Sequence, residues 1–283
     1  MRFPRDKPPF SERVFAHWLA EFANDQGLPD HRLRRWISTT VILAAVERYE
    51  TENGTPLALL EGGAAMELRL GLRARASKDV DLVLLVPTDG LEQLRSALAH
   101  GWHDFTCHER GATPIHETGT VQIDLQVRYR GDVWQRVKLE VAQAEGALAD
   151  DVELIKAPIQ LSTFGLPAGP ARIACLGVSY QIAQKLHACT ERFAGRANTR
   201  VRDVPDLVLL AEFVDDWAAV RAACADVFDV RAKQAWPPNV EPEPTWAAEY
   251  AGVIDELEGF PAMVFDDAFG RVNAIIRRID EAR

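Results

Sequence analysis

The chain has 283 residues, of which 47% are hydrophobic and 26% are charged. This length and composition allow one large domain or two smaller ones with a substantial core. The formal net charge of −10 argues against a protein that coats nucleic acid nonspecifically, because such a protein needs a basic surface. Local basic patches remain open, since basic residues cluster at Arg32–Arg35, Arg69–Lys78, Arg192–Arg202 and Arg277–Arg278.

Several classes of protein are disfavoured by simple counts. No apolar run approaches the roughly 20 residues that a membrane helix needs, and the first fifteen residues lack the apolar region of a secretory signal. The cysteines form no Cys-x-x-Cys pair, which favours neither a zinc ribbon nor a disulfide framework. We therefore expect a cytoplasmic protein with reduced thiols and no membrane partner. The four cysteines are Cys107, Cys175, Cys189 and Cys224.

The N-terminal part of the chain changes between helical and strand periodicity. Apolar residues first recur at helical spacing, then as short runs bounded by glycine or proline. The second helix is expected to end at Asn53-Gly54, and the last strand at Pro87. The expected elements are helices at Ser11–Asn24 and His31–Glu52, a strand at Pro56–Leu60, a helix at Ala64–Leu72, a strand at Val80–Val86 and a helix at Gly90–His100.

A hairpin is predicted in the middle of the chain. Val121–Tyr129 alternates strictly between apolar and polar residues, Arg136–Val141 does likewise, and Gly131-Asp132 supplies a turn. The preceding stretch has loop composition. Its possible zinc ligands are irregularly spaced, so we treat zinc as a minor alternative. They are His100, His103, Cys107, His108 and His116.

From about Leu176 onward the sequence is helical, which makes the whole chain a mixed α/β (α+β) protein with a helical C-terminal half. The Pro-rich stretch Trp236–Pro244 is interpreted as a solvated linker. The expected helices are Ser179–Phe193, Val204–Val214, Trp217–Val227, Trp246–Leu257 and Ala262–Asp280.

The segment from residue 60 to residue 85 carries the parts that phosphoryl transfer needs. Gly62 and Gly63 let the backbone approach phosphate oxygens, and the start of the following helix offers free N–H donors. Asp79 and Asp81 lie two residues apart on a strand, so both face one side and can share Mg²⁺. Each feature alone is often only a tight turn or a polar strand end. Their order, with a basic connector between them, favours a nucleotide site.

This pattern resembles the nucleotidyltransferase superfamily of the DNA polymerase β type, in which Gly-Gly or Gly-Ser precedes a short helix and an Asp-x-Asp strand. It is more similar to the AbiEii/AbiGii toxin family, which includes the mycobacterial MenT toxins. Members of that family often have Thr or Ser directly after the glycines, where this chain has Ala64 and Ala65. The residues that match the family pattern are Gly62, Gly63, Met66, Arg69, Gly71, Ser77, Asp79, Asp81 and Leu82.

A third carboxylate is implied by the resemblance, in a segment such as Val-Lys-(apolar)-Asp/Glu-(apolar). The segment Val137–Val141 fits that pattern, so Glu140 is preferred as a metal ligand or general base. Asp124 is the competitor. Each lies on the polar face of its strand, so either could simply be solvated.

A second match lies in the helical half, between Ser179 and Leu210. It resembles the family element Glu/Gln-Lys-Leu-His-Ala…Arg…Arg-x-Lys/Arg-Asp-x-x-Asp-Leu-x-x-Leu. By resemblance, Lys185 contacts the triphosphate, and Asp203 orients Lys185 or caps a helix at the site. The matching residues are Lys185, Leu186, His187, Ala188, Arg192, Arg202, Asp203, Asp206, Leu207 and Leu210.

Plainer interpretations of these residues stay open. A lysine beside an apolar stripe usually extends to water, and Asp203 before a helix could be an N-cap. Asp206 could complement the helix dipole, and His187 is expected to pack within its helix. Arg200 and Arg202 could bind phosphate or an RNA backbone.

The resemblance implies a nucleotidyltransferase-fold mixed sheet with flanking helices, followed by a helical domain. We expect N-terminal helices at 1–55, the nucleotidyltransferase core at 56–165, and a helical domain at 166–283 that contributes Lys185 and Asp203. The implied activity is transfer of a nucleoside monophosphate from an NTP to an acceptor, with release of pyrophosphate. The implied role is the toxin of a toxin–antitoxin pair, and tRNA 3′ ends are the best-known acceptors.

The expected cofactor is Mg²⁺ or Mn²⁺, and the expected partners are an NTP, a tRNA acceptor and a cognate antitoxin protein. One alternative is transfer to a protein or small molecule. Another is a nucleotide-binding regulatory protein with little turnover. We expect metal binding by Asp79, Asp81 and Glu140, catalysis by these residues with Lys185 and Asp203, and nucleotide binding by Gly62, Gly63, Ser77, Lys78, Lys185, Arg202 and Asp206.

Overall fold

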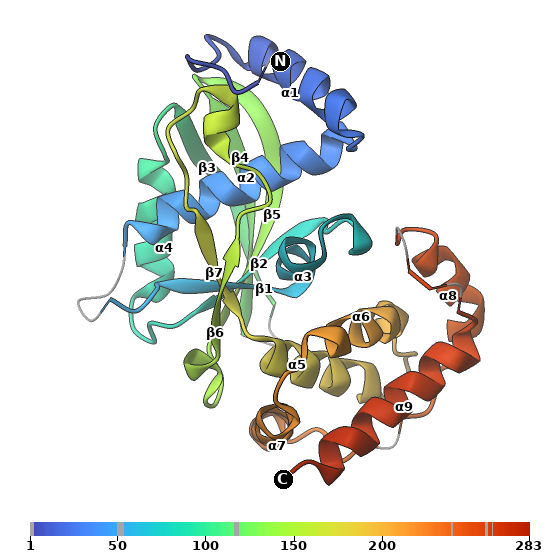
Figure 1. Ribbon diagram of the computed structural model, residues 1–283. Coiled ribbons are helices and arrows are strands. Elements are labelled where there is room, and N and C mark those ends of the chain that lie inside the picture. Colours follow the sequence, from blue (N-terminus) through green and yellow to red (C-terminus); the bar gives the residue numbers. More distant parts are fainter. Residues whose placement is uncertain (1–2, 50–53, 116–118, 239, 258–259, 262) are drawn as a thin grey trace. The chain divides into compact units, whose positions relative to one another are not determined.

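Figure 1 shows the computed structural model, which describes residues 3–49, 54–115, 119–238, 240–257, 260–261 and 263–283. The chain forms two compact units, and each is described by itself. The first unit comprises Met1–Arg69, Ala76–Ala144 and Glu153–Cys175. The second comprises Leu70–Arg75, Glu145–Val152 and Leu176–Arg283. The three-part division at residues 55 and 165 stays a prediction.

The first unit is built on a mixed sheet. Within the described residues it has seven strands in the order β3-β4-β5-β2-β1-β7-β6. β1 pairs antiparallel with β2 and parallel with β7, and β2 pairs parallel with β5. The strands are β1 (Ala58–Glu61), β2 (Asp79–Leu84), β3 (Phe105–Ile115), β4 (Thr120–Tyr129), β5 (Asp132–Gln143), β6 (Val152–Lys156) and β7 (Arg172–Leu176).

The predicted hairpin is confirmed as β4 and β5, which pair antiparallel from Val121↔Val141 to Tyr129↔Asp132. Ile123, Leu125 and Val127 are buried, as their alternation indicated. Gly131 adopts a φ of +92° in the turn, a conformation that glycine tolerates best. β4 begins one residue earlier than predicted, and β5 extends beyond the predicted Arg136–Val141 at both ends, so that Asp132 of the predicted turn is already its first residue.

The prediction of a loop before this hairpin was wrong, because β3 occupies that stretch. Only Phe105 and Cys107 are buried in it, and most of its later residues are exposed. An edge strand that leaves both faces to water has no apolar alternation to detect. His116 lies outside the described residues.

Helices α1 (Glu12–Gln26) and α2 (Asp30–Glu47) belong to the first unit. The Ser11 hydroxyl accepts a hydrogen bond from the Val14 N–H at 3.3 Å, so Ser11 is the N-cap of the helix that was expected to start there. α2 was expected to reach Glu52 but ends at Glu47, since Val46 is its last buried residue and polar residues follow. Residues 50–53 lie outside the described part.

An aromatic cluster fixes α1 against the strands. The Phe15 ring stacks on Trp134 with centroids 4.4 Å apart and contacts Tyr129 and Phe105 at 5.2 and 6.1 Å. Large buried aromatic side chains dominate core energetics. The two remaining helices of this region are α3 (Gly62–Leu70) and α4 (Gly90–His100), and α4 has the predicted bounds.

The second unit is helical, as predicted. α5 packs against α7, and α6 packs against α9. The predicted helix Val204–Val214 ends at Leu210 and continues as a 3₁₀ turn, whereas the helix from Trp217 runs on to Arg231. No helix of the described chain is long and apolar enough to span a membrane. The helices are α5 (Val178–Thr190), α6 (Asp203–Leu210), α7 (Trp217–Arg231), α8 (Trp246–Ile254) and α9 (Phe265–Glu281).

Candidate active site

The glycine pair lies between β1 and α3. The sequence predicted a helix starting at Ala64, but both glycines already form its first turn. Gly62 has a φ of +61°, and a Cβ placed there would overlap the Oδ2 atom of Asp81. A Cβ on Gly63 would lie 2.8 Å from the Ser77 hydroxyl. The backbone therefore approaches both side chains more closely than any other residue type allows.

Asp79 and Asp81 open β2 and face the same side of the sheet, as their spacing predicted. The parallel register of β2 with β5 places Asp81 directly opposite Glu140 and Asp79 opposite Lys138. Paired residues of neighbouring strands share a face. The sheet thus sets Glu140 beside Asp81, and a nearby amide fixes it, since Gln122 Nε2 donates to Glu140 Oε1 at 3.1 Å.

Asp124 occupies a different place. It pairs with Lys138 across the β4–β5 ladder, so a lysine position separates it from Asp79. It is exposed, whereas Glu140 is half-buried. Both carboxylates share the polar face, and Glu140 is the one adjacent to the Asp-x-Asp strand.

Ser77 is anchored where the connector enters β2. It is 5% exposed, and its N–H donates to Glu67 Oε2 at 3.0 Å. Its hydroxyl donates to the Asp79 carbonyl at 2.8 Å, and Arg35 donates to the Ser77 carbonyl. Lys78, by contrast, is exposed. Ser77 therefore sets the backbone position of Asp79, and the nucleotide-binding role of these two residues stays a prediction.

Sequence reasoning missed a buried ion pair beneath this turn. Arg32 of α2 donates from Nε and Nη2 to Glu67 Oε1 of α3, at 3.0 and 2.8 Å. Their exposed fractions are 5% and 3%. Burial raises the pKa of Glu67, while the Ser77 N–H and Arg32 oppose that rise. Arg32 lies one turn before the buried Trp36, and that helical spacing was the one available signal that it faces inward.

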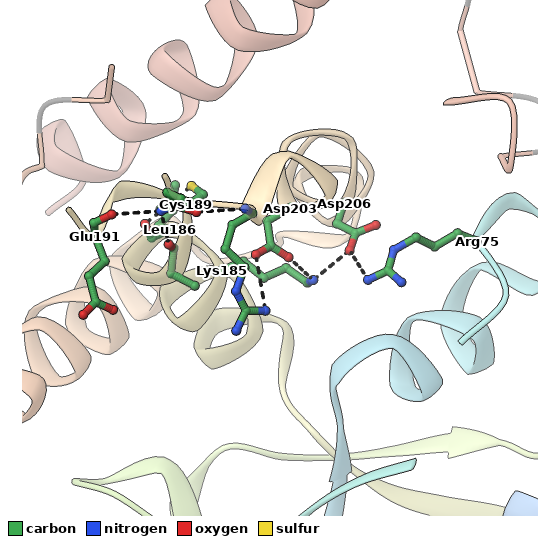
Figure 2. Close-up of polar contacts among 10 residues, drawn as sticks. Arg75, Lys185, Leu186, Cys189, Glu191, Asp203 and Asp206 are labelled. Atoms are coloured by element: carbon green, nitrogen blue, oxygen red, sulfur yellow. Dashed lines mark hydrogen bonds and ion pairs between the residues drawn. The ribbon is translucent and has the colours of Figure 1, made fainter. Parts of the chain in front are cut away.

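A second cluster forms within the helical unit (Figure 2). Lys185 Nζ donates to Asp203 Oδ1 at 2.8 Å and to Asp206 Oδ2 at 2.7 Å, and Arg75 Nη2 lies 3.4 Å from the same Asp206 oxygen. The side chains of Lys185, Asp203 and Asp206 are almost fully buried. Burial lowers the pKa of Lys185, but the two aspartates outweigh it and the net effect is a raised pKa. Lys185 therefore stays charged.

Two plain interpretations of this region were wrong. Lys185 does not extend to water but is held by two carboxylates. Asp203 is not an N-cap, because it is the first residue of α6 and its side chain binds Lys185. Arg202 is exposed. His187 packs against Phe228 with ring centroids 5.0 Å apart, as predicted, and burial lowers its pKa to about 4.

The carboxylates at the start of β2 and on β5 form the donor set for a metal ion. Across the described residues, no three His, Cys, Asp or Glu side chains are already gathered as a metal cluster. The carboxylates of Asp79 and Asp81 share one face, and Glu140 is the neighbour of Asp81 on the adjacent strand. Hard cations such as Mg²⁺ take one or two protein carboxylates together with phosphate oxygens and water. These residues fit that chemistry once a nucleotide supplies the remaining ligands.

A family model described as "Nucleotidyl transferase AbiEii toxin, Type IV TA system" matches residues 45–271. With the glycine turn and the Asp-x-Asp strand, this match makes the protein a nucleotidyltransferase. More narrowly, the chain belongs to the AbiEii nucleotidyltransferase toxin family, so the predicted family is confirmed.

Two solved structures are similar to this chain. MenT4, a nucleotidyltransferase toxin from Mycobacterium tuberculosis H37Rv, is 18% identical, with 93% of this chain and 98% of that chain covered and a TM-score of 0.57. JHP933 from Helicobacter pylori is 15% identical, with 89% and 93% covered and a TM-score of 0.48. No curated protein sequence matches the chain. The likeness to MenT4 confirms the predicted fold class.

Proposed function

We propose that this toxin-family nucleotidyltransferase uses Mg²⁺, or Mn²⁺ in its place, to move a nucleoside monophosphate from an NTP to the 3′ end of a tRNA. The observation that carries the proposal is the site on the sheet. Asp79 and Asp81 lie on one face, Glu140 lies beside them, and the glycine turn approaches Asp81 too closely for any side chain. Carboxylates and open backbone thus meet where a metal-bound triphosphate needs both.

The reaction forms one P–O bond and breaks another. The acceptor hydroxyl oxygen attacks the α-phosphorus, the bond from that phosphorus to the bridging oxygen breaks, and pyrophosphate leaves. We assign the metal to Asp79 and Asp81, and propose Glu140 as either a third ligand or the base that takes the hydroxyl proton. When bound, Mg²⁺ supplies charge that offsets the negative charge of the phosphates. Gly62 and Gly63 border the phosphates.

Lys185 is proposed to bind triphosphate oxygens. Its ammonium group has three N–H donors, and two of them point to Asp203 and Asp206. These aspartates hold the side chain in one orientation and keep it charged, so little conformational entropy remains to be lost when a phosphate binds. We propose Asp203 and Asp206 as positioning residues for Lys185, with Arg202 as a further phosphate contact.

The test is a transfer assay on purified full-length protein. Each α-labelled NTP is incubated with Mg²⁺ and total cellular tRNA, beside an Asp79→Ala/Asp81→Ala control. We expect label on tRNA with wild type only. Label on protein or on a small molecule would move the acceptor to the alternative class. NTP binding without transfer under any metal would contradict the catalytic assignment and favour a nucleotide-sensing role.

A matched pair of variants tests which carboxylate is the third. Glu140→Gln is expected to lower the transfer rate by about 10²-fold or more, the usual range for loss of an acid–base group or ligand. Asp124→Asn, on the same face but beside Lys138, is expected to stay close to wild type. A larger loss in Asp124→Asn would exchange the two assignments.

A further inference from the structure

The loop between α5 and α6, from Glu191 to Arg202, is held in one conformation by Asn198. This asparagine is 3% exposed, and its Nδ2 donates to the carbonyls of Ala188 and Glu191 at 2.8 and 2.9 Å. Its Oδ1 accepts from the Arg200 N–H at 2.8 Å. We call residues 191–202 the arginine loop. Its backbone is preorganised, so a ligand that binds it does not have to order it first.

The rest of the helical unit fixes the loop as well. The Trp246 indole N–H donates to the Asn198 carbonyl at 2.6 Å, and the Asn198 N–H donates to Glu243 at 3.1 Å. Trp246 is fully buried. A buried tryptophan of α8 therefore anchors the arginine loop.

The arginine side chains of the arginine loop point into solvent. Its four arginines, at positions 192, 196, 200 and 202, are all exposed, and Glu191 is its one acidic residue. The loop thus carries a net charge of +3 in a chain whose net charge is −10. Positive charge that is concentrated on one ordered loop of an acidic protein favours the binding of a polyanion.

The arginine side chains of two ion pairs in this loop are exposed. Arg192 pairs with Glu241, and both side chains are more than half exposed. Arg200 lies 4.0 Å from Asp203 and is 61% exposed. Pairs of this kind contribute little to stability because water screens them. A phosphate group can therefore take the place of Glu241 at small cost, and Arg200 can turn to a phosphate while Asp203 keeps its bond to Lys185.

Two features favour RNA over other polyanions. The Arg196 guanidinium lies 4.2 Å from the centroid of the Phe193 ring, and such arginine–aromatic pairs stack on unpaired bases. Arg192 also lines a hollow with Thr190, Lys233 and Gln234. Gln234 Nε2 donates to the His187 carbonyl and to Thr190 Oγ1, at 2.9 and 2.6 Å, so the hollow is preformed.

From these observations we propose that the arginine loop binds the phosphate backbone and unpaired bases of a single-stranded RNA segment. The proposal rests on the proposed function, because it gives the tRNA acceptor a binding surface. Arg192, Arg196 and Arg200 hold phosphates, the Phe193 ring beside Arg196 stacks on a base, and the hollow beside Arg192 receives a nucleotide.

The experiment measures equilibrium binding of fluorescent tRNA to full-length protein by anisotropy, without NTP or Mg²⁺, over a range of salt. The test variant is Arg192→Gln/Arg196→Gln/Arg200→Gln. The control, Arg221→Gln/Arg271→Gln/Arg277→Gln, removes the same charge from exposed positions on α7 and α9. Thermal unfolding by circular dichroism checks that both variants fold, as expected for exposed side chains.

Each phosphate contact on single-stranded nucleic acid contributes about 0.7 to the slope of log affinity against log salt. Loss of three contacts should lower that slope by about 2 and weaken binding at 0.1 M salt by about 100-fold. The control should stay close to wild type. Equal losses in both variants, or an unchanged slope in the loop variant, would overturn the proposal.

The transfer assay separates this proposal from the proposed function. Wild type that binds tRNA through the loop but labels nothing would support the RNA surface and contradict tRNA as acceptor. Wild type that labels tRNA while the loop variant binds it normally would do the opposite. If wild type binds no RNA and the loop variant instead loses a purified antitoxin, the surface belongs to a protein partner and the RNA proposal fails.

Discussion

Replacing Arg32 with methionine would leave the carboxylate of Glu67 buried without its cation. Arg32 and Glu67 are 5% and 3% exposed, and two hydrogen bonds join them. Removing one partner of a buried ion pair costs about 3–5 kcal/mol. We therefore expect Arg32→Met to lose about that much of its free energy of unfolding at pH 7, a large share of the stability of an ordinary domain.

The pH dependence follows from the raised pKa of Glu67. A carboxyl group whose folded pKa lies above its unfolded pKa favours folding most when it is protonated, and that contribution is lost as pH rises through the folded pKa. Without Arg32 the pKa of Glu67 rises further. The stability deficit of Arg32→Met should therefore shrink as pH falls.

Two double variants separate the charge from the hydrogen bond to Ser77. Arg32→Met/Glu67→Gln removes both charges but keeps an oxygen that can accept from the Ser77 N–H. Arg32→Met/Glu67→Leu removes the acceptor too, and an orphaned buried N–H costs about 1–3 kcal/mol. We expect the Gln double variant to be more stable than the Leu double variant by that amount, and to retain more transferase activity because Ser77 holds Asp79.

Urea unfolding followed by far-ultraviolet circular dichroism measures these free energies from the midpoint and the slope. Because the chain has two units, the unfolding of the wild type must first be shown to be two-state. The transition followed by tryptophan fluorescence must coincide with the one followed by circular dichroism. A loss below about 1 kcal/mol in Arg32→Met would refute the reasoning, since it would make the pair no more important than a surface contact. Equal stability of the two double variants would refute the role of the Ser77 hydrogen bond.

Three further predictions test the site and its surroundings. Gly62→Ala should lower transferase activity sharply, because its Cβ would overlap Asp81. The control is Gly27→Ala, at a position with a similar φ of +65° and open space around it. It should lose about 1 kcal/mol of stability and keep full activity in the same assay. Burial lowers the pKa of His187 from 6.5 to about 4, so the folded protein favours the neutral imidazole. The resulting contribution to the free energy of unfolding is fully present above pH 6.5, and about 3 kcal/mol of it is lost as pH falls to 4. In urea titrations His187→Leu should show a shallower decline over that range, and an identical decline would contradict the assignment. Lys185→Met should raise the KM for NTP as well as lower kcat, and an unchanged KM would count against a phosphate contact.

The features that could be predicted from the sequence are those that depend on residues close together in the chain. Strict alternation gave the β4–β5 hairpin, and the Asp-x-Asp spacing gave two carboxylates on one face. The family resemblance implied a third carboxylate and left Glu140 and Asp124 as candidates for it, and only the strand register shows that Glu140 lies beside Asp81. The register between two parallel strands is set by tertiary structure, so it could not be predicted from a single sequence.

What sequence could not foretell joins distant segments. Arg32 and Glu67 are 35 positions apart, and Arg75 and Asp206 are 131 apart. Arg32 stood in a basic cluster that is normally a solvated helix face, and burial within the fold overrode that expectation. Strands β6 and β7 are short, and the sheet shows them through pairing rather than through a period in their residues.

The two units described above are interleaved along the chain: Leu70–Arg75 and Glu145–Val152 belong to the helical unit although the sheet unit surrounds them in sequence. No single cleavage can therefore separate the two units cleanly. A fragment ending at residue 175 would keep Arg75 but lose Asp206, and it would retain Glu145–Val152 without the helices that these residues accompany. A chain that stops at residue 175 therefore holds every residue of the sheet unit but only two short segments of the helical unit. Because Lys185 lies in the missing part, we expect transfer activity to appear only once the helical unit has also been synthesised.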